Sequence, residues 1–135
     1  MLKLAKSVEY AIFALKYIAE NPQSDCISTK EISEKMNIPY DLLAKILQRL
    51  VKDELIYSIQ GTKGGYSLKV QPGDVSITRI INAVDQKIQL TDCMFHGATT
   101  DDCGRVETCC LRSPLSRIQD KINILFDNTT LMEII

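Results

Sequence analysis

The chain has 135 residues and a mass of 15.2 kDa, and 45% of its residues are hydrophobic. This size allows one compact domain or a small domain with an appended arm, and the composition argues against a disordered chain. The net charge of −1 argues against a protein that binds polyanions through bulk charge. No apolar run approaches the roughly 18 residues of a membrane span, and the N-terminus lacks the apolar block of a secretory signal. We therefore expect a cytoplasmic protein.

Helical spacing of apolar residues predicts three helices in the first half of the chain. The first runs over 6–20 and ends at Asn21-Pro22. Ser28 and Glu31 form a capping-box pattern at the start of a short second helix. A turn over 37–39 leads into the third helix, whose predicted inner face is Leu42, Leu43, Ile46, Leu47, Leu50 and Val51.

Strand-like runs over 55–60 and 66–70 flank the glycine-rich segment 61–65, which predicts a hairpin. Ser76 is a candidate cap for a fourth helix with an apolar face at 77, 80, 81 and 84. Apolar residues in the segment 88–112 follow neither a helical nor a strand-like spacing. Ser113-Pro114 then predicts the start of a long helix, and Asn128-Thr129-Thr130 a cap for a last apolar segment, 131–135. The long helix has a narrow apolar seam suited to pairing with another helix, formed by Leu115, Ile118, Ile122 and Leu125.

Two short helices joined by a turn and followed by a hairpin are typical of a winged helix-turn-helix, in which the second helix of the pair enters the DNA major groove. Candidate contacts on the third helix are Tyr40, Lys45, Gln48 and Arg49. Those on the hairpin are Gln60, Gly61, Thr62, Lys63, Gly64 and Gly65, where small residues allow close approach to the phosphates. The alternative is a helix pair and hairpin used only for packing.

Four segments carry a resemblance to the Rrf-two (Rrf2) family of bacterial transcription regulators, of the IscR/NsrR type. They are 59–68 at the hairpin, 4–11, 80–85 and 125–131. The resemblance implies a mainly α fold with a small β-hairpin, a homodimer formed through the long C-terminal helix, and a palindromic operator in double-stranded DNA. We expect a DNA-binding domain at 1–87, a cysteine-rich loop at 88–112, and a dimerisation helix with the C-terminal segment at 113–135.

Four of the five cysteines, Cys93, Cys103, Cys109 and Cys110, fall within 18 residues. Cytosolic thiols are kept reduced, so clustered cysteines there more often bind metal or sense redox state than form structural disulfides. Thiolates are the usual ligands of iron–sulfur clusters. Three of these cysteines would leave a four-ligand site one donor short. Cys26 is expected to be an ordinary free thiol.

The resemblance implies a use for these cysteines. Sensing members of the family hold an iron–sulfur cluster with three cysteines of this loop, and some take another ligand from a carboxylate near the start of the partner's first helix. Glu9 matches that position. This sequence departs from the pattern in three ways. The spacing between the first two cysteines, Cys93 and Cys103, is longer. Ser113 stands where other members have histidine, and the third cysteine is doubled. We favour Cys110 over Cys109, because a leucine follows it, and leave the cluster type, 2Fe–2S or 4Fe–4S, open.

We therefore expect a transcriptional repressor whose operator affinity is controlled by a cluster that senses nitric oxide, redox state or iron–sulfur status. One alternative is a cluster-free thiol switch in which Cys109 and Cys110 act with Cys93 or Cys103. Another is a zinc-stabilised protein-interaction module that uses His96. An enzyme is not expected, since no histidine base accompanies a nucleophile and no phosphate-binding loop is present.

Overall fold

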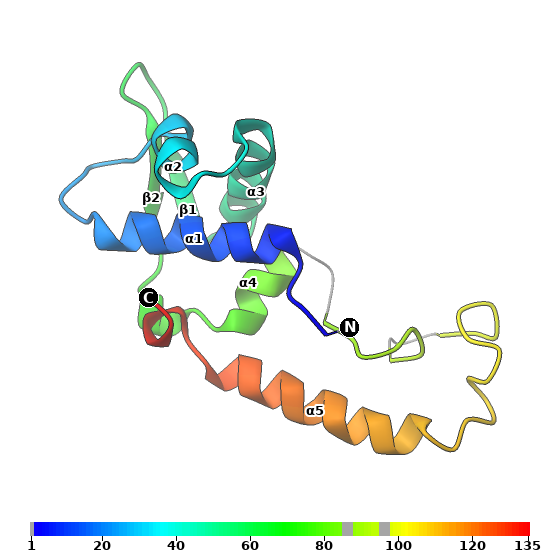
Figure 1. Ribbon diagram of the computed structural model, residues 1–135. Coiled ribbons are helices and arrows are strands. Elements are labelled where there is room, and N and C mark those ends of the chain that lie inside the picture. The colour runs from blue at the N-terminus through cyan, green and yellow to red at the C-terminus, as the bar shows by residue number, and fades with distance from the viewer. Residues whose placement is uncertain (1, 85–87, 95–97) are drawn as a thin grey trace.

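The computed structural model describes residues 2–84, 88–94 and 98–135, and Figure 1 shows the order of the elements along the chain. The predicted class, mainly α with a small hairpin, is confirmed. In chain order the elements are α1 (Lys6–Glu20), α2 (Thr29–Met36), α3 (Tyr40–Lys52), β1 (Ile56–Ile59), β2 (Gly65–Leu68), η1 (Pro72–Asp74), α4 (Ile77–Val84), α5 (Arg112–Asn128) and η2 (Leu131–Glu133).

Local side-chain chemistry sets the ends of α2. The hydroxyl of Ser28 accepts the backbone N–H of Glu31 at 3.1 Å, as the capping pattern predicts. The carboxylate of Glu31 accepts the hydroxyl of Tyr17 at 2.8 Å, and this hydrogen bond raises the pKa of Tyr17. Asn37 ends the helix in the left-handed conformation with φ 53°, which asparagine tolerates well. The chain can therefore turn sharply into α3.

The hydrophobic core lies among α1, α3, α4 and the base of the hairpin. It includes Val8, Ala11, Leu15, Ile32, Leu43, Ile46, Leu47, Leu50, Leu55, Ile80, Ile81 and Leu131. The predicted inner face of α3 is largely correct. Leu42 is the exception, because its side chain is 38% exposed whereas the neighbouring Leu43 is 0% exposed. Adjacent residues on a helix are separated by about 100° around its axis, so Leu42 falls at the edge of the buried stripe.

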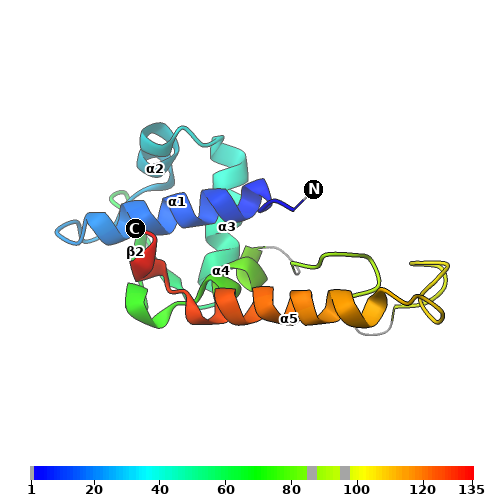
Figure 2. The same cartoon turned by 60° about the horizontal axis from the view of Figure 1, so that its bottom comes forward.

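The hairpin and the C-terminal segment are both held by backbone hydrogen bonds. β1 and β2 are antiparallel, with Ile56 opposite Leu68 and Ile59 opposite Gly65. Near the other end of the chain, the backbone N–H of Ile77 donates to Thr129 at 2.9 Å, and that of Leu131 donates to Val75 at 2.8 Å. The C-terminal segment is thereby attached to the start of α4, as Figure 2 also shows.

The helix α5 begins at Arg112, one residue earlier than the Ser113-Pro114 pattern predicts. The predicted Ser113 cap is wrong, because Leu111 occupies the capping position and no side chain caps the helix there. Ser113 is already within the first turn, where its backbone carbonyl accepts the hydroxyl of Ser116 at 2.7 Å. The predicted caps at Ser76 and Thr130 are confirmed.

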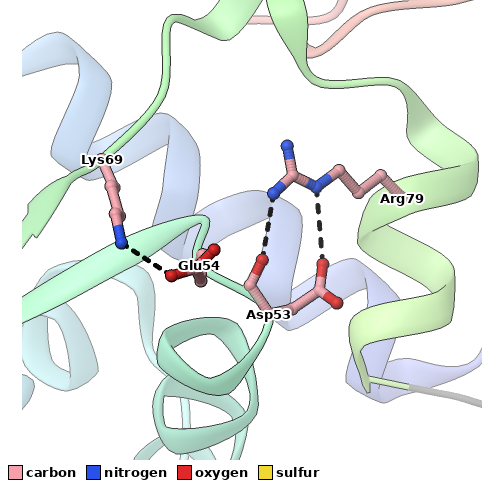
Figure 3. A network of polar contacts seen from close by, with 4 residues as sticks. All are labelled: Asp53, Glu54, Lys69 and Arg79. Atoms are coloured by element: carbon pink, nitrogen blue, oxygen red, sulfur yellow. Dashed lines mark hydrogen bonds and ion pairs between the residues drawn. The ribbon is translucent and has the colours of Figure 1, made fainter.

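Polar contacts attach α4 to the turn that follows α3 (Figure 3). The guanidinium of Arg79 donates to the backbone carbonyl of Asp53 at 3.0 Å, and its Nε lies 3.5 Å from the Asp53 carboxylate. Beside it, Lys69 pairs with Glu54 at 2.9 Å, and this hydrogen-bonded cation lowers the pKa of Glu54. Exposed ion pairs contribute little to stability, so the Arg79 contacts mainly orient α4 against the end of α3.

Among the helices that the structure describes, none combines the length and the apolar character needed to cross a membrane.

The neighbouring leucines of α3 provide a matched test of the core. We expect Leu43→Ala to lower the free energy of unfolding by about 2–5 kcal/mol, because it opens a cavity in packed surroundings. Leu42→Ala should cost about 1 kcal/mol or less, since that side chain is already partly in water. Urea unfolding at several protein concentrations would measure both. Equal losses for the two variants would contradict the described orientation of α3.

Candidate DNA-reading surface and cysteine loop

The outer face of α3 carries the predicted reading residues. Tyr40, Lys45, Gln48 and Arg49 all lie on it and are exposed. Arg49 differs from the others because its guanidinium donates to the backbone carbonyl of Val84, the last residue of α4, at 2.6 Å. Part of its hydrogen-bonding capacity is therefore used inside the protein. The side chains of Tyr40, Lys45 and Gln48 form an exposed polar face that could hydrogen-bond to base edges and phosphates.

The wing consists of β1, β2 and the tip 60–64 between them. Gln60, Gly61, Thr62 and Lys63 are exposed at this tip. The backbone N–H of Gly64 donates to Gly61 at 3.0 Å, which closes the turn. Gly61 has φ 120°, a conformation that favours glycine, and a side chain added there would meet open space.

Gly64 and Gly65 also have a packing role that the sequence did not predict. A β-carbon at Gly64 would collide with the backbone carbonyl of Ile59, and one at Gly65 would collide with the backbone of Ile27. These two glycines are required because backbone segments approach each other closely inside the wing. Of the three wing glycines, only Gly61 has open space where a side chain would stand, so it leaves the tip of the wing accessible from solvent.

The segment before α2 is attached to the wing. Ile27 and Tyr66 exchange backbone hydrogen bonds of 3.0 and 2.8 Å. The thiol of Cys26 donates to the backbone carbonyl of Lys63 at 2.9 Å. Cys26 is a free thiol, as predicted, and it also contacts the wing. The wing is therefore fixed relative to the start of α2.

A hollow of about 290 Å³ lies between the wing and the two helices. Its lining combines the start of α2, the first residue of α3 and the wing tip: Ser28, Thr29, Lys30, Tyr40, Ser58, Gln60, Gly61 and Gly64 are among its residues. The backbone N–H groups at a helix N-terminus favour anions. The wing, the start of α2 and the first residue of α3 therefore border one mostly polar hollow.

The cysteine loop, residues 88–94 and 98–111 of the described chain, extends from α4 to the N-terminal end of α5 (Figure 1). Cys93 is 8% exposed and its sulfur lies 3.1 Å from the hydroxyl of Thr91. Cys103 and Cys109 are half-buried, and Cys110 is exposed. Short-range turns dominate the loop, such as the N–H of Cys109 donating to Arg105 at 2.8 Å.

Two of these thiols share one hollow. Cys93 and Cys109 both line a space of about 540 Å³ at the start of α5, together with Met94, Val106, Glu107, Arg112, Ser113 and Ser116. Cys103 and Cys110 are not among its lining residues. The doubled cysteine is therefore split, with Cys109 toward the hollow and Cys110 toward solvent.

The residues present do not form a ligand set for a metal in this arrangement. Within 2–84, 88–94 and 98–135, no three histidine, cysteine, aspartate or glutamate side chains lie close enough together to hold an ion. Glu9 instead pairs with Lys6 at 2.6 Å, and the carboxylate raises the pKa of Lys6. His96, the histidine of the zinc alternative, lies outside the described residues. A cluster bound by Cys93, Cys103, one of the Cys109–Cys110 pair and Glu9 is not preformed in one chain.

The helix α5 leaves most of its apolar side chains uncovered. Ile118 is 48% and Leu125 is 60% exposed, and Leu115 and Ile122 are half-buried. The buried residue of α5 is instead Gln119, which is 7% exposed. Sequence reasoning missed Gln119. Its position, four residues after Leu115 and three before Ile122, places it on the apolar stripe and could have revealed it.

Comparisons with known proteins agree with this geometry. The model of the Rrf2 family, described as iron-dependent transcriptional regulators, matches residues 4–135. The HTH-type transcriptional regulator IscR of Cronobacter sakazakii is 28% identical over 134 residues, which cover 99% of this chain and 80% of that protein.

Two solved structures share the fold. CymR (YrzC), the global cysteine regulator of B. subtilis, has a TM-score of 0.75 at 22% identity and covers 99% of this chain and 96% of its own. The oxidized form of Staphylococcus aureus CymR has a TM-score of 0.73 at 25% identity, covering 96% and 93%. All three relatives are named as regulators and none as an enzyme.

The described loop predicts an order of thiol reactivity. In metal-free, reduced protein, we expect iodoacetamide to modify Cys110 fastest and Cys93 slowest, because alkylation requires access to the sulfur. Peptide mass spectrometry at successive times would measure each rate. In urea the rates should converge, which serves as the control. Equal rates for Cys93 and Cys110 in the folded protein would contradict the described burial.

Proposed function

The chain belongs to the Rrf2 family of transcriptional regulators, and we propose that it binds a palindromic operator as a cytoplasmic homodimer and represses transcription. It is a regulator and not an enzyme. In this proposal residues 1–87 read DNA, 88–112 sense a signal and 113–135 dimerise. The observation that carries the proposal is the mostly polar hollow bordered by the wing, the start of α2 and Tyr40 of α3, together with the exposed polar face of α3.

The DNA-binding roles follow from this surface. Lys45 and Gln48 project from the outer face of α3, where they would reach base edges and phosphates in the major groove. Lys63 at the wing tip would contact a phosphate beside the groove, and Gly61 leaves space for close approach. Thr62 and Gln60 would donate further hydrogen bonds to the sugar-phosphate chain. The net charge of +2 over residues 1–70, against −3 over 71–135, supports this half as the one that meets DNA.

The dimerisation role rests on α5. A helix of 17 residues extends over about 25 Å, and its exposed apolar residues Ile118 and Leu125 lie on the predicted seam. Burying such side chains against a second copy contributes about 25 cal/mol per Å² of apolar surface. A two-fold dimer presents two equivalent reading helices, which matches a palindromic operator.

The cysteine loop is the proposed sensing element because it leads directly into α5. The description of the family as iron-dependent supports an iron–sulfur cluster held by Cys93, Cys103 and Cys110 or Cys109. The thiols of one chain are not gathered for this, so binding would require the loop to close and Glu9 of a second copy to leave Lys6. When bound, such a group supplies chemistry that responds to nitric oxide, oxygen and iron supply.

A second candidate is a thiol switch between Cys93 and Cys109, and the shared hollow favours it. A peroxide would oxidise the two thiols to a disulfide: its O–O bond accepts the two electrons and the two thiol protons, and the products are one alcohol and one water from an alkyl hydroperoxide, or two waters from hydrogen peroxide. The relative from Staphylococcus aureus was crystallised in an oxidized form. Either chemistry would rearrange the chain immediately before α5, and so change how the two reading helices are spaced.

We expect operator binding to weaken steeply as salt concentration rises, because each phosphate contact releases counterions. Lys63→Ala should reduce the slope of log K against log salt by about 1, and Lys45→Ala by a similar amount. Fluorescence anisotropy with labelled operator DNA would measure the slopes. Lys121→Ala, an exposed lysine of α5, is the matched control and should leave the slope unchanged. An unaltered slope for Lys63→Ala would remove the wing from the interface.

Purification without oxygen separates the two sensing chemistries. A cluster predicts a coloured protein with matched iron and sulfide, and loss of colour in Cys93→Ser and Cys103→Ser. The spectrum should also change in Glu9→Ala if that carboxylate is a ligand. A colourless, metal-free protein would contradict the cluster. Zinc without sulfide would support the interaction module instead. For the thiol switch, peroxide should link Cys93 to Cys109, as detected by peptide mass spectrometry.

A further inference from the structure

The tip of the wing, residues 60–64, is attached to the helical part of the chain by the side chain of Cys26. Within the tip, the N–H of Gly64 donates to the carbonyl of Gly61, and this bond stays inside the hairpin. From outside the hairpin, the Cys26 thiol donates to the backbone carbonyl of Lys63 at 2.9 Å. Among the described residues, no other hydrogen bond joins the tip to a segment outside the hairpin. The position of Lys63 therefore depends on where Cys26 lies.

The tip needs this attachment because the hairpin holds it only weakly. An isolated two-stranded hairpin is marginally stable at best in water, and β1 and β2 have only four residues each. The tip contains Gly61 and Gly64, and glycine adopts many backbone conformations. The tip also extends beyond α2 in Figure 1, and residues 60–63 are exposed. A contact from outside the hairpin therefore restricts where the tip lies.

The segment that carries Cys26 is itself fixed against the base of the wing. On one side of Cys26, the buried Ile27 exchanges backbone hydrogen bonds of 3.0 and 2.8 Å with Tyr66 of β2. On the other side, the backbone carbonyl of Asp25 accepts the hydroxyl of Ser67, the next residue of β2. Both neighbours of Cys26 are thus bound to β2, so the thiol reaches the tip from a fixed position.

The same segment connects the wing to the two helices of the DNA-reading half. Ser28 directly follows Ile27 and caps α2, and α2 shares the core with α3 through Ile32 and Leu43. Cys26 therefore ties the tip to α2, and through α2 to the reading helix. This matters because a protein that reads base edges takes its register from contacts with the phosphates. Lys63 at the tip must keep its place relative to α3 for both kinds of contact to form together.

We propose that Cys26 and Ser67 are positioning residues for DNA binding, which hold the wing so that Lys63 meets its phosphate. The inference rests on the proposed function, because it requires that Lys63 contacts DNA. Each of the two side chains acts through a backbone carbonyl and not through a contact of its own with DNA. A wing held in its binding position loses less conformational entropy on association, which raises affinity. A thiol is a weak hydrogen-bond donor, so the effect of Cys26 is modest and depends on Lys63.

The test is a double-mutant cycle between Cys26 and Lys63. The parent protein selects a DNA duplex from a random-sequence library, and fluorescence anisotropy measures the dissociation constant of that labelled duplex. All variants are full-length, fully reduced and purified without oxygen. We expect Cys26→Ala to weaken binding by about 2- to 5-fold, as for the loss of a weak hydrogen bond. In a Lys63→Ala background, the same change should weaken binding by less than about 1.5-fold, because the two residues act as a pair.

Matched variants separate positioning from a general loss of structure. Cys26→Ser keeps a hydrogen-bond donor at the same place and should bind within about twofold of the parent. Ser67→Ala removes the second attachment and should weaken binding by about twofold, again only when Lys63 is present. Ser24→Ala removes an exposed hydroxyl from the same segment and should bind like the parent. A variant that only lowers the stability of the fold would lose affinity equally in both Lys63 backgrounds.

The outcomes distinguish this inference from the function on which it rests. If the parent protein selects no duplex, or if Lys63→Ala binds like the parent, the proposed contact and the positioning role are both overturned. If Lys63→Ala weakens binding, the contact stands, and whichever of Cys26→Ala and Ser67→Ala then binds like the parent has no positioning role. Equal losses in both Lys63 backgrounds also overturn that role. Losses confined to protein that retains Lys63, with Cys26→Ser close to the parent, support the proposal.

Discussion

The burial of α4 against α3 and α1 is the contact on which the rest of the molecule depends. Four residues of α4, namely Ile77, Ile80, Ile81 and Val84, are buried, although the helix has only eight residues. A helix so short is not stable alone in water, so its position must come from its surroundings. Ser76 caps its start, the C-terminal segment is attached there, and Arg49 binds its end. The N-terminal half and the C-terminal arm therefore meet at this one helix.

The sequence predicted those features that depend on local pattern. Periodic apolar residues predicted α1 with its observed ends, and the cap at Ser28 and the glycines of the wing predicted the helix pair and the hairpin. Leu42 was wrongly assigned to the buried face of α3, because the apolar pattern does not define the edges of that face. Ser113 was wrongly assigned as the cap of α5, because a serine before proline is a frequent cap and not an invariable one. The backbone partners of Arg49 and Gln119 could not be predicted, because each partner lies about thirty residues away in the chain. No periodicity encodes such pairings.

The arrangement of the cysteine loop also could not be predicted from the sequence. Spacing in an aperiodic segment does not say which sulfurs face one another, and the doubled cysteine could not be resolved from the sequence. The structure separates the pair by burial, with Cys109 at a hollow that Cys93 also lines and Cys110 in solvent. The preference for Cys110 as a cluster ligand, based on the leucine that follows it, stays a prediction. Leu111 is 59% exposed and therefore does not fix Cys110 by packing.

The weak anchoring of this loop is consistent with a sensing role. Cys93 and Val106 are buried, but neither belongs to the main core, and the remaining contacts are mainly turns within the loop. Segments with few buried apolar contacts open at low free-energy cost. Forming a cluster or a disulfide in this loop would therefore break few existing contacts, and the free-energy cost of rearranging the loop would be small. The cluster or disulfide can shift the equilibrium only by its preference for one arrangement over the other. Where the described loop meets α5, the buried amide of Gln119 binds the backbone of Ile88 and Leu90, so the start of the loop is held more firmly than the turns that carry the cysteines.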